Sequence, residues 1–320
     1  SGLLQLYSQS KLTPMKGLSL NVGLHSQYFL LNDKYSIEPR AGLKYELNDN
    51  QSLAVAYGLH SRIERLPVYL VKINGTTPNK QLDLLKSHHY VLSYNMKLNP
   101  YMRLSVEPYY QSLTNIPVAP HGYMSTINMK NDVFLNQDLI NDGTGRNLGV
   151  DVTFEQFLHN GFYYLATASI FDSKYTAADG VERNTRFNKN FVFNVLVGNE
   201  WMLGRSKNNI LSTNIRVNYL GGNRKEPIEM QSSAIDREVV YGEKNGSIAF
   251  SDRYKDVPVV SLSVSYRKNK PNYSSVWSLH ILNASSAQEY SNDLFNLRTE
   301  QVETIFEGIM LPNLSYKIEF

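Results

Sequence analysis

The chain has 320 residues, a formal net charge of +3 and a mean hydropathy of −0.35. It contains no run of about 18 apolar residues, the length that a membrane-spanning helix needs, so a helical membrane protein is excluded. The nearly balanced charge gives no indication of a nucleic-acid partner. The absence of cysteine excludes disulfides, zinc–thiolate clusters and thiol catalysis.

Alternation of apolar and polar residues predicts β-strands along the whole chain. In 36–47, for example, Ile37 and Leu43 fall on one face, while Glu38 and Lys44 fall on the other. The same pattern is found in the segments 18–28, 52–60, 101–111, 147–155, 260–267 and 313–320. In strands of this kind, averaging the hydropathy over neighbouring residues cancels the apolar face against the polar face. A membrane β-barrel therefore remains compatible with the low mean hydropathy.

Turn residues divide the connections into two classes. Tight turns are predicted at 13–17, 48–50, 99–100, 159–161, 204–209, 270–272 and 308–312. Longer polar connections are predicted at 30–36, 61–86, 114–146, 172–187, 221–257 and 283–297. Each tight turn closes a hairpin, so about 14 antiparallel strands are expected in an up-and-down order. Short turns then lie at one end of the sheet and long loops at the other, as in outer-membrane barrels.

Aromatic residues recur near the ends of the predicted strands on their apolar faces. They are Tyr28, Tyr45, Tyr57, Tyr94, Tyr110, Phe154, Trp201, Tyr219, Tyr266 and Tyr273. Rings at the depth of the lipid headgroups form the two girdles of a membrane barrel. The pattern therefore favours a transmembrane barrel over the alternative, a soluble β-sandwich.

Three segments, 36–64, 146–175 and 298–320, carry a resemblance to a known family. Together with the order of the other strands, they resemble the β-barrel of TonB-dependent outer-membrane receptors, close to the SusC-like branch. The resemblance covers essentially the whole chain. Receptors of this family have a barrel of about 22 strands with an N-terminal plug in its lumen.

The resemblance implies that residues 1–320 are the C-terminal portion of such a barrel. The signal peptide, TonB box, plug and about eight strands of the family pattern would then lie outside this chain, and Ser1 would follow a cut. The alternative is a complete, smaller barrel of about 14 strands that closes on itself.

The resemblance also implies a function in the bacterial outer membrane. We expect the barrel portion of a TonB-dependent nutrient uptake receptor, and the alternative is a passive porin or a structural or adhesive barrel. The implied partners are outer-membrane lipid, a TonB-type energy coupler acting through the missing N-terminal part, and a surface lipoprotein. No nucleic acid and no cofactor is expected.

No catalytic or metal-binding constellation is predicted, so the chain is not expected to be an enzyme. His88 and His89 are adjacent, but neighbouring residues on a strand point to opposite faces and cannot hold one metal ion. An outer-membrane hydrolase, which needs a serine, a histidine and an orienting group together, is the least favoured alternative.

Ligand contact is expected in two of the long loops. The candidates are His121 and Tyr123 in 116–145, and Arg224, Tyr241 and Tyr254 in 221–257. The alternative interpretation is that these side chains pack the loops against one another. At the end of the chain, the resemblance implies that Tyr316 and Phe320 belong to a signal for the barrel-assembly machinery.

Overall fold

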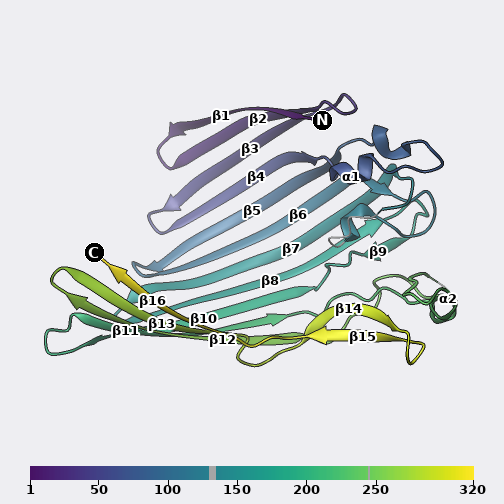
Figure 1. The fold of residues 1–320 in the computed structure, drawn as a ribbon. Coiled ribbons are helices and arrows are strands. Elements are labelled where there is room, and N and C mark those ends of the chain that lie inside the picture. Colours follow the sequence, from purple (N-terminus) through teal and green to yellow (C-terminus); the bar gives the residue numbers. More distant parts are fainter. Residues whose placement is uncertain (130–134, 244–245) are drawn as a thin grey trace.

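The computed structural model describes residues 1–129, 135–243 and 246–320 and consists mainly of antiparallel strands (Figure 1). The strands are β1 (Leu3–Met15), β2 (Leu18–Phe29), β3 (Lys34–Asn48), β4 (Gln51–Arg62), β5 (Leu85–Asn99), β6 (Met102–Val118), β7 (Ile140–His159), β8 (Phe162–Thr176), β9 (Glu182–Asn184), β10 (Phe191–Leu203), β11 (Asn209–Leu220), β12 (Val257–Lys270), β13 (Tyr273–Leu282), β14 (Glu289–Asn296), β15 (Gln301–Glu307) and β16 (Leu311–Glu319). The short helices are α1 (Leu66–Tyr69), η1 (Pro78–Gln81), η2 (Thr126–Asn128) and α2 (Met230–Asp236). Among the described residues, no helix is long and apolar enough to cross a membrane.

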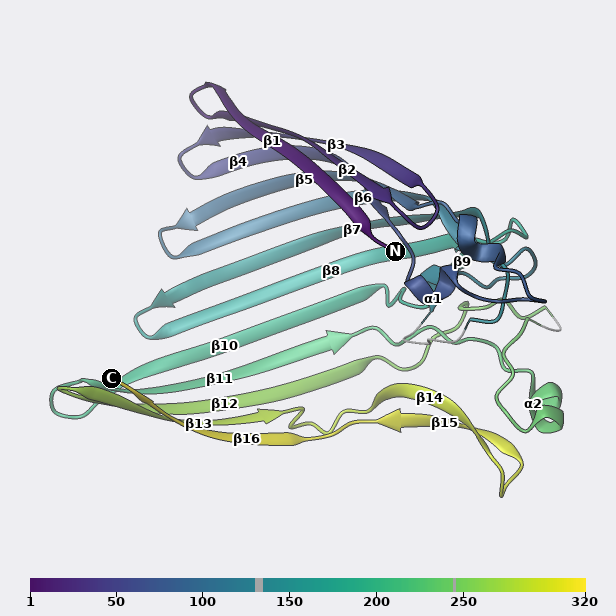
Figure 2. The ribbon, with the colours of Figure 1, turned by 45° about the horizontal axis from the view of Figure 1, so that its top comes forward.

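Except for β14 and β15, which form a separate two-stranded sheet, the strands form one up-and-down meander, as predicted. Its order is β1-β2-β3-β4-β5-β6-β7-β8-β10-β11-β12-β13-β16, and the short β9 adds to the end of β8 to give a 14-stranded sheet. The sheet bends across its width. Figure 1 shows this bend, since β5–β8 face the viewer while β11–β13 are seen almost edge-on. Figure 2 shows the same curved wall after a turn of 45°.

The sheet is open in the part of the chain that the structure describes. β1 pairs only with β2, and β16 pairs only with β13. These strands do not close on themselves, so the alternative of a small self-closed barrel is wrong for the described residues. The architecture is that of a segment of a wider up-and-down barrel.

All the predicted tight turns except the last are confirmed as hairpin turns at one end of the sheet. The stretch 308–312 is not a hairpin turn, because β15 pairs with β14 while β16 pairs with β13. Pro312, which suggested a turn, lies within β16 opposite Ile281. A proline is tolerated there because Pro312 is the second residue of β16, and a missing N–H disrupts the ladder least near a strand end.

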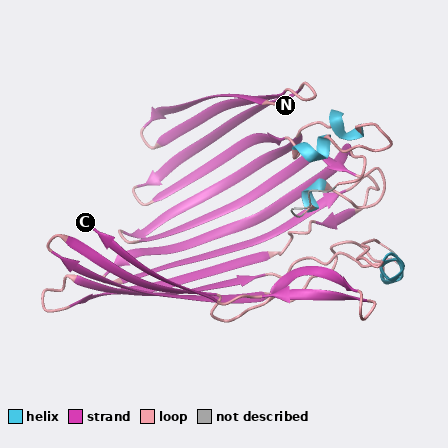
Figure 3. Cartoon of the chain, viewed as in Figure 1, coloured by secondary structure: helices cyan, strands magenta, loops and turns pink. Residues whose placement is uncertain are grey.

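The long connections lie at the other end, but several predicted bounds are wrong. The connection predicted at 283–297 extends to residue 310 and contains β14 and β15, and β8 continues to Thr176 within the stretch predicted at 172–187. The connection predicted at 30–36 comprises only residues 30–33, since Tyr35 and Ser36 already pair with β2. In 114–146 the strands continue further, to Val118 on β6 and from Ile140 on β7. Figure 3 shows that the helices gather at this end, which we call the loop end.

The two faces of the sheet have opposite chemistry. Apolar side chains point outward and remain exposed; Leu43, Val150 and Leu262, on three separate strands, are each 40% exposed. Polar side chains line the inner face and bond across strands, as when Ser93 donates to Glu107 at 2.7 Å. A broad exposed apolar face with a polar inner face is typical of a barrel in lipid.

The hydrophobic core lies between the loops and the strand ends at the loop end. One buried cluster contains Leu85, Ile116, Val118, Tyr175, Ala177, Ala249 and Phe250. A second contains Phe29, Val68, Tyr69, Leu82 and Leu139. Both clusters join residues from several loops, so the loops form a packed layer on the strands.

Candidate functional site

A buried arginine connects the loop between β8 and β10 to the loop between β11 and β12. Arg183 is 4% exposed and lies on β9, which adds to the edge of β8. Its guanidinium donates to Asp179 at 2.6 Å and to Glu243 at 2.6 Å. These charge-assisted hydrogen bonds lower the pKa of both carboxyl groups below their ordinary values. The pairs hold the two loops together.

A second set of contacts brings in the loop between β6 and β7. The Tyr123 hydroxyl donates to Glu226 Oε1 at 3.0 Å, and Arg186 Nη2 pairs with Glu226 Oε2. Burial, and then the adjacent Glu226 carboxylate, raise the pKa of Tyr123. The Arg186 guanidinium also lies 5.3 Å from the centre of the Phe250 ring. Three loops therefore meet around one carboxylate.

These contacts border a cavity of about 750 Å³, which we call the loop pocket. Its wall comes from three long loops and from β14. The lining residues are His121, Gly122, Tyr123, Met124, Ser125, Asn128, Met129, Leu135, Gln137, Arg186, Glu226, Glu238, Val239, Val240, Tyr241, Phe250 and Asn292. A cavity of this size, with apolar walls and a few convergent polar groups, has the properties of a ligand site.

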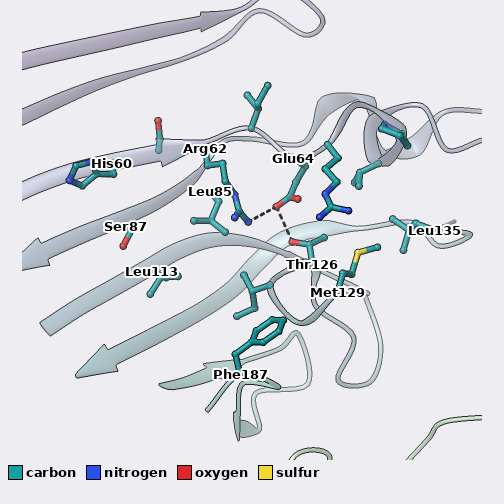
Figure 4. Close-up of a pocket in the computed structure, with 16 residues that line it drawn as sticks. His60, Arg62, Glu64, Leu85, Ser87, Leu113, Thr126, Met129, Leu135 and Phe187 are labelled. Atoms are coloured by element: carbon teal, nitrogen blue, oxygen red, sulfur yellow. Dashed lines mark hydrogen bonds and ion pairs between the residues drawn. The ribbon is translucent and has the colours of Figure 1, made fainter. Parts of the chain in front are cut away.

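A second cavity of about 620 Å³, the inner pocket, lies beside the ends of β4, β5 and β6 (Figure 4). Glu64 is 8% exposed there and accepts a hydrogen bond from Thr126 at 2.9 Å. Arg62 lies 3.6 Å from the same carboxylate oxygen. Phe187 and Leu113 add apolar wall.

One short segment separates the two pockets. Ser125 and Asn128 line the loop pocket, while Thr126 and Ile127 of the same turn line the inner pocket. Met129 lines both pockets. The 3-10 helix η2 thus lies between the two cavities, and each of its residues lines one or the other.

The residues predicted from sequence divide into two groups. His121, Tyr123 and Tyr241 line the loop pocket, so the structure brings them together. Arg224 donates to the backbone oxygens of Asn188 and Ser251, and it holds loops together.

Tyr254 is also placed among loop contacts, since it stacks on Tyr290 of β14 with ring centres 4.3 Å apart. Parts of the two loops expected to contact ligand, residues 130–134 and 244–245, lie outside the described residues. Ligand contact by the five named residues stays a prediction.

Sequence reasoning missed Ser125, Asn128 and Arg186, which all line the loop pocket. In the sequence they are ordinary polar loop residues, and only the packing of three loops buries them. No local pattern could have identified them.

The adjacent His88 and His89 lie on opposite faces of the sheet. His88 points outward beside Tyr57, with ring centres 6.1 Å apart, while His89 points inward toward His60. The described residues contain no cluster of three or more groups suited to a metal ion.

Near the end of the chain, Tyr316 lies on the outer face and packs on Trp277, with ring centres 4.3 Å apart. Phe320 is fully exposed just beyond β16. A role of these two residues in assembly stays a prediction.

No family model and no curated protein matches the sequence. Solved structures do match. The pyoverdine outer membrane receptor FpvA of Pseudomonas aeruginosa, bound to pyoverdine, matches with a TM-score of 0.67 at 13% identity over 99% of this chain and 42% of that one. The ferric preacinetobactin receptor BauA of Acinetobacter baumannii gives a TM-score of 0.66 at 12% identity, over 99% of this chain and 43% of that one.

The ferric yersiniabactin uptake receptor FyuA of Yersinia pestis matches with a TM-score of 0.64 at 12% identity, over 99% of this chain and 46% of that one. The chain thus spans less than half the length of each of these structures. The SusC-like branch suggested by the sequence stays a prediction. The chain has the fold of a barrel segment of outer-membrane receptors.

Proposed function

We propose that the chain is the barrel portion of an outer-membrane nutrient uptake receptor of the TonB-dependent kind. The observation that carries this proposal is the combination of an exposed apolar outer face with two roomy pockets at the loop end. The apolar face suits lipid. The pockets suit capture of a ligand before it enters the lumen. The likeness to outer-membrane receptors supports the same function.

The polar inner wall would line the route of the ligand below these pockets. Asp151 accepts a hydrogen bond from Ser169 at 2.5 Å, and Asn147 donates to Gln111 at 2.8 Å. Such pairs across strands keep polar groups satisfied where the sheet faces water or another polar element. A plug supplied by the wider protein would occupy this space.

The packed loops favour a receptor over a passive porin. Arg183 and its two carboxylate partners hold loops in a fixed arrangement, with buried aromatic residues beneath them. A simple pore has no need for a structured binding layer at its mouth.

The TonB-type coupler and a surface lipoprotein are proposed partners of the wider protein, and Tyr316 and Phe320 are proposed to guide its assembly.

Cell fractionation and growth assays test this function. The protein is expected in the outer-membrane fraction, with faster migration in unheated than in heated detergent gels. Disruption of its gene, or of the coupler, is expected to abolish growth on the same limiting nutrient. A monodisperse protein that needs no detergent would overturn the membrane assignment, and growth that is lost without the receptor but kept without the coupler would favour a porin.

A further inference from the structure

We propose that the loop pocket binds an uncharged, amide-bearing ligand, such as a peptide, through Ser125, Asn128 and Arg186. This inference rests on the proposed receptor function and names its ligand class. It starts from polar atoms that the fold buries without giving them a partner.

Asn128 provides the clearest of these atoms. The residue is 5% exposed, and its Oδ1 accepts a hydrogen bond from the backbone N–H of Arg186 at 2.9 Å. That contact fixes the orientation of the amide, so the group left without a partner is the Nδ2 donor. A buried donor with no partner is unfavourable, and a bound acceptor would remove that cost.

Two further unpartnered atoms belong to residues that line the same pocket. Ser125 is 3% exposed, and its hydroxyl has no partner. Arg186 pairs with Glu226 through Nη2, but its buried Nε–H is unpaired.

Such atoms are concentrated in this pocket. In the part of the chain that the structure describes, the one other such atom is Glu155 Oε2, and it lies 2.9 Å from Arg103. Three of the four unpartnered atoms therefore belong to residues that line a single cavity.

The charge of the wall selects among ligands. The Arg186 guanidinium is neutralised by Glu226, which also accepts the Tyr123 hydroxyl. Among the described residues that line the pocket, an anion would therefore find no free positive charge to offset the cost of its desolvation. A neutral carbonyl oxygen can instead accept from the donors of Asn128 and Arg186, and the Ser125 hydroxyl can accept an amide N–H.

The remaining wall suits the flanks of such a ligand. Tyr123 and Phe250 present rings, and Met124 and Val240 present aliphatic surface. A polyol would expose many hydroxyl groups to this apolar surface without partners. A peptide would place an amide against the donors and a side chain against the rings.

Binding to the purified, detergent-folded protein is measured by calorimetry with three probes. They are an uncharged hexapeptide with an acetylated N-terminus and an amidated C-terminus, maltohexaose as a neutral polyol, and citrate as an anion. We expect the hexapeptide to bind and the other two to bind at least about tenfold more weakly.

Two variants test the donors directly. Asn128→Asp keeps the acceptor for the Arg186 N–H but removes the donor, and Ser125→Ala removes the free hydroxyl. Both are expected to weaken hexapeptide binding about tenfold or more, with Ser125→Ala leaving the urea midpoint unchanged because it breaks no protein contact.

Asn32→Asp is the matched control, because the Asn32 amide is buried but donates to the backbone oxygens of Lys80 and Leu82. It is expected to lower stability and to leave hexapeptide binding unchanged. The proposed ligand class would be overturned if citrate or maltohexaose bound more strongly than the hexapeptide. It would also be overturned if the Asn128→Asp variant bound the hexapeptide as tightly as the unchanged protein, or if no hexapeptide binding were detected up to about 10 mM. Because the protein would still be an outer-membrane barrel that supports growth, that failure differs from failure of the proposed function.

Discussion

The strands and the loop end place the same kinds of residue in opposite environments. On the strands, apolar side chains such as Leu314 point outward and are largely exposed, while polar side chains face inward. At the loop end, Phe250 and Tyr175 are almost completely buried, as in a water-soluble protein. The contrast indicates two solvents along one chain: lipid around the strands and water around the loops.

The largest expected effect comes from the buried loop core. Phe250→Ala is expected to destabilise the loop end by about 3–5 kcal/mol, because the ring packs beside Tyr123 and Tyr175 and leaves a cavity when removed. Hydrogen exchange should show faster exchange in the loops and unchanged exchange in the strands. If hydrogen exchange became equally faster in the loops and in the strands, the two regions would not be stabilised separately.

A charge on the outer face tests the lipid environment. Val150→Arg is expected to destabilise the folded barrel by about 2–4 kcal/mol in lipid vesicles, because an outward arginine must enter hydrocarbon. Thr153→Arg is the matched control, since Thr153 pairs with Ser105 and Thr167 on the inner face. Urea unfolding in vesicles measures both variants, and equal losses would contradict the assignment of the two faces.

The Arg183 pairs make the loop end sensitive to acid. The pKa values of Asp179 and Glu243 are lowered in the folded state, so their stabilisation is present above the ordinary carboxyl range and is lost as pH falls through the lowered values. Loop amides should exchange faster as the pH drops through that range, while strand amides should not. In the Arg183→Met variant, the acceleration of loop-amide exchange at low pH should be smaller. If the acceleration is unchanged in this variant, the acid sensitivity comes from other groups.

The smallest expected effect concerns the outer aromatic pair. Tyr316→Leu keeps an apolar side chain in the outer face but removes the ring packed on Trp277. A loss of about 0.5–1.5 kcal/mol is expected from such a pair. The temperature at which the fast-migrating gel form disappears should fall slightly, and a rise would show that the pair does not stabilise the strand.

The regular part of the fold was predictable from local patterns. Alternation assigns each residue of a strand to a face, so the outward position of Leu43 and the inward position of Glu38 follow from the order of residues alone. Tight turns such as the one containing Gly17, with φ of +80°, were recognisable because they need specific residue types.

Other features depend on partners that are distant in the sequence. Pro312 suggested a turn, but it is a strand residue because β16 pairs with β13 across the intervening β14–β15 hairpin. The strand that β16 pairs with is decided by the order of the whole sheet.

The sequence by itself therefore determined the strands, their faces and the end at which the loops gather, because these depend on residues a few positions apart. Only the tertiary structure decided the loop pocket. Asn128 and Arg186 are 58 residues apart in the chain, and their contact exists because packed strands bring two loops together. Burial and hydrogen-bond partners are decided by such long-range packing, so the unpartnered donors of the candidate site appear only in the folded chain.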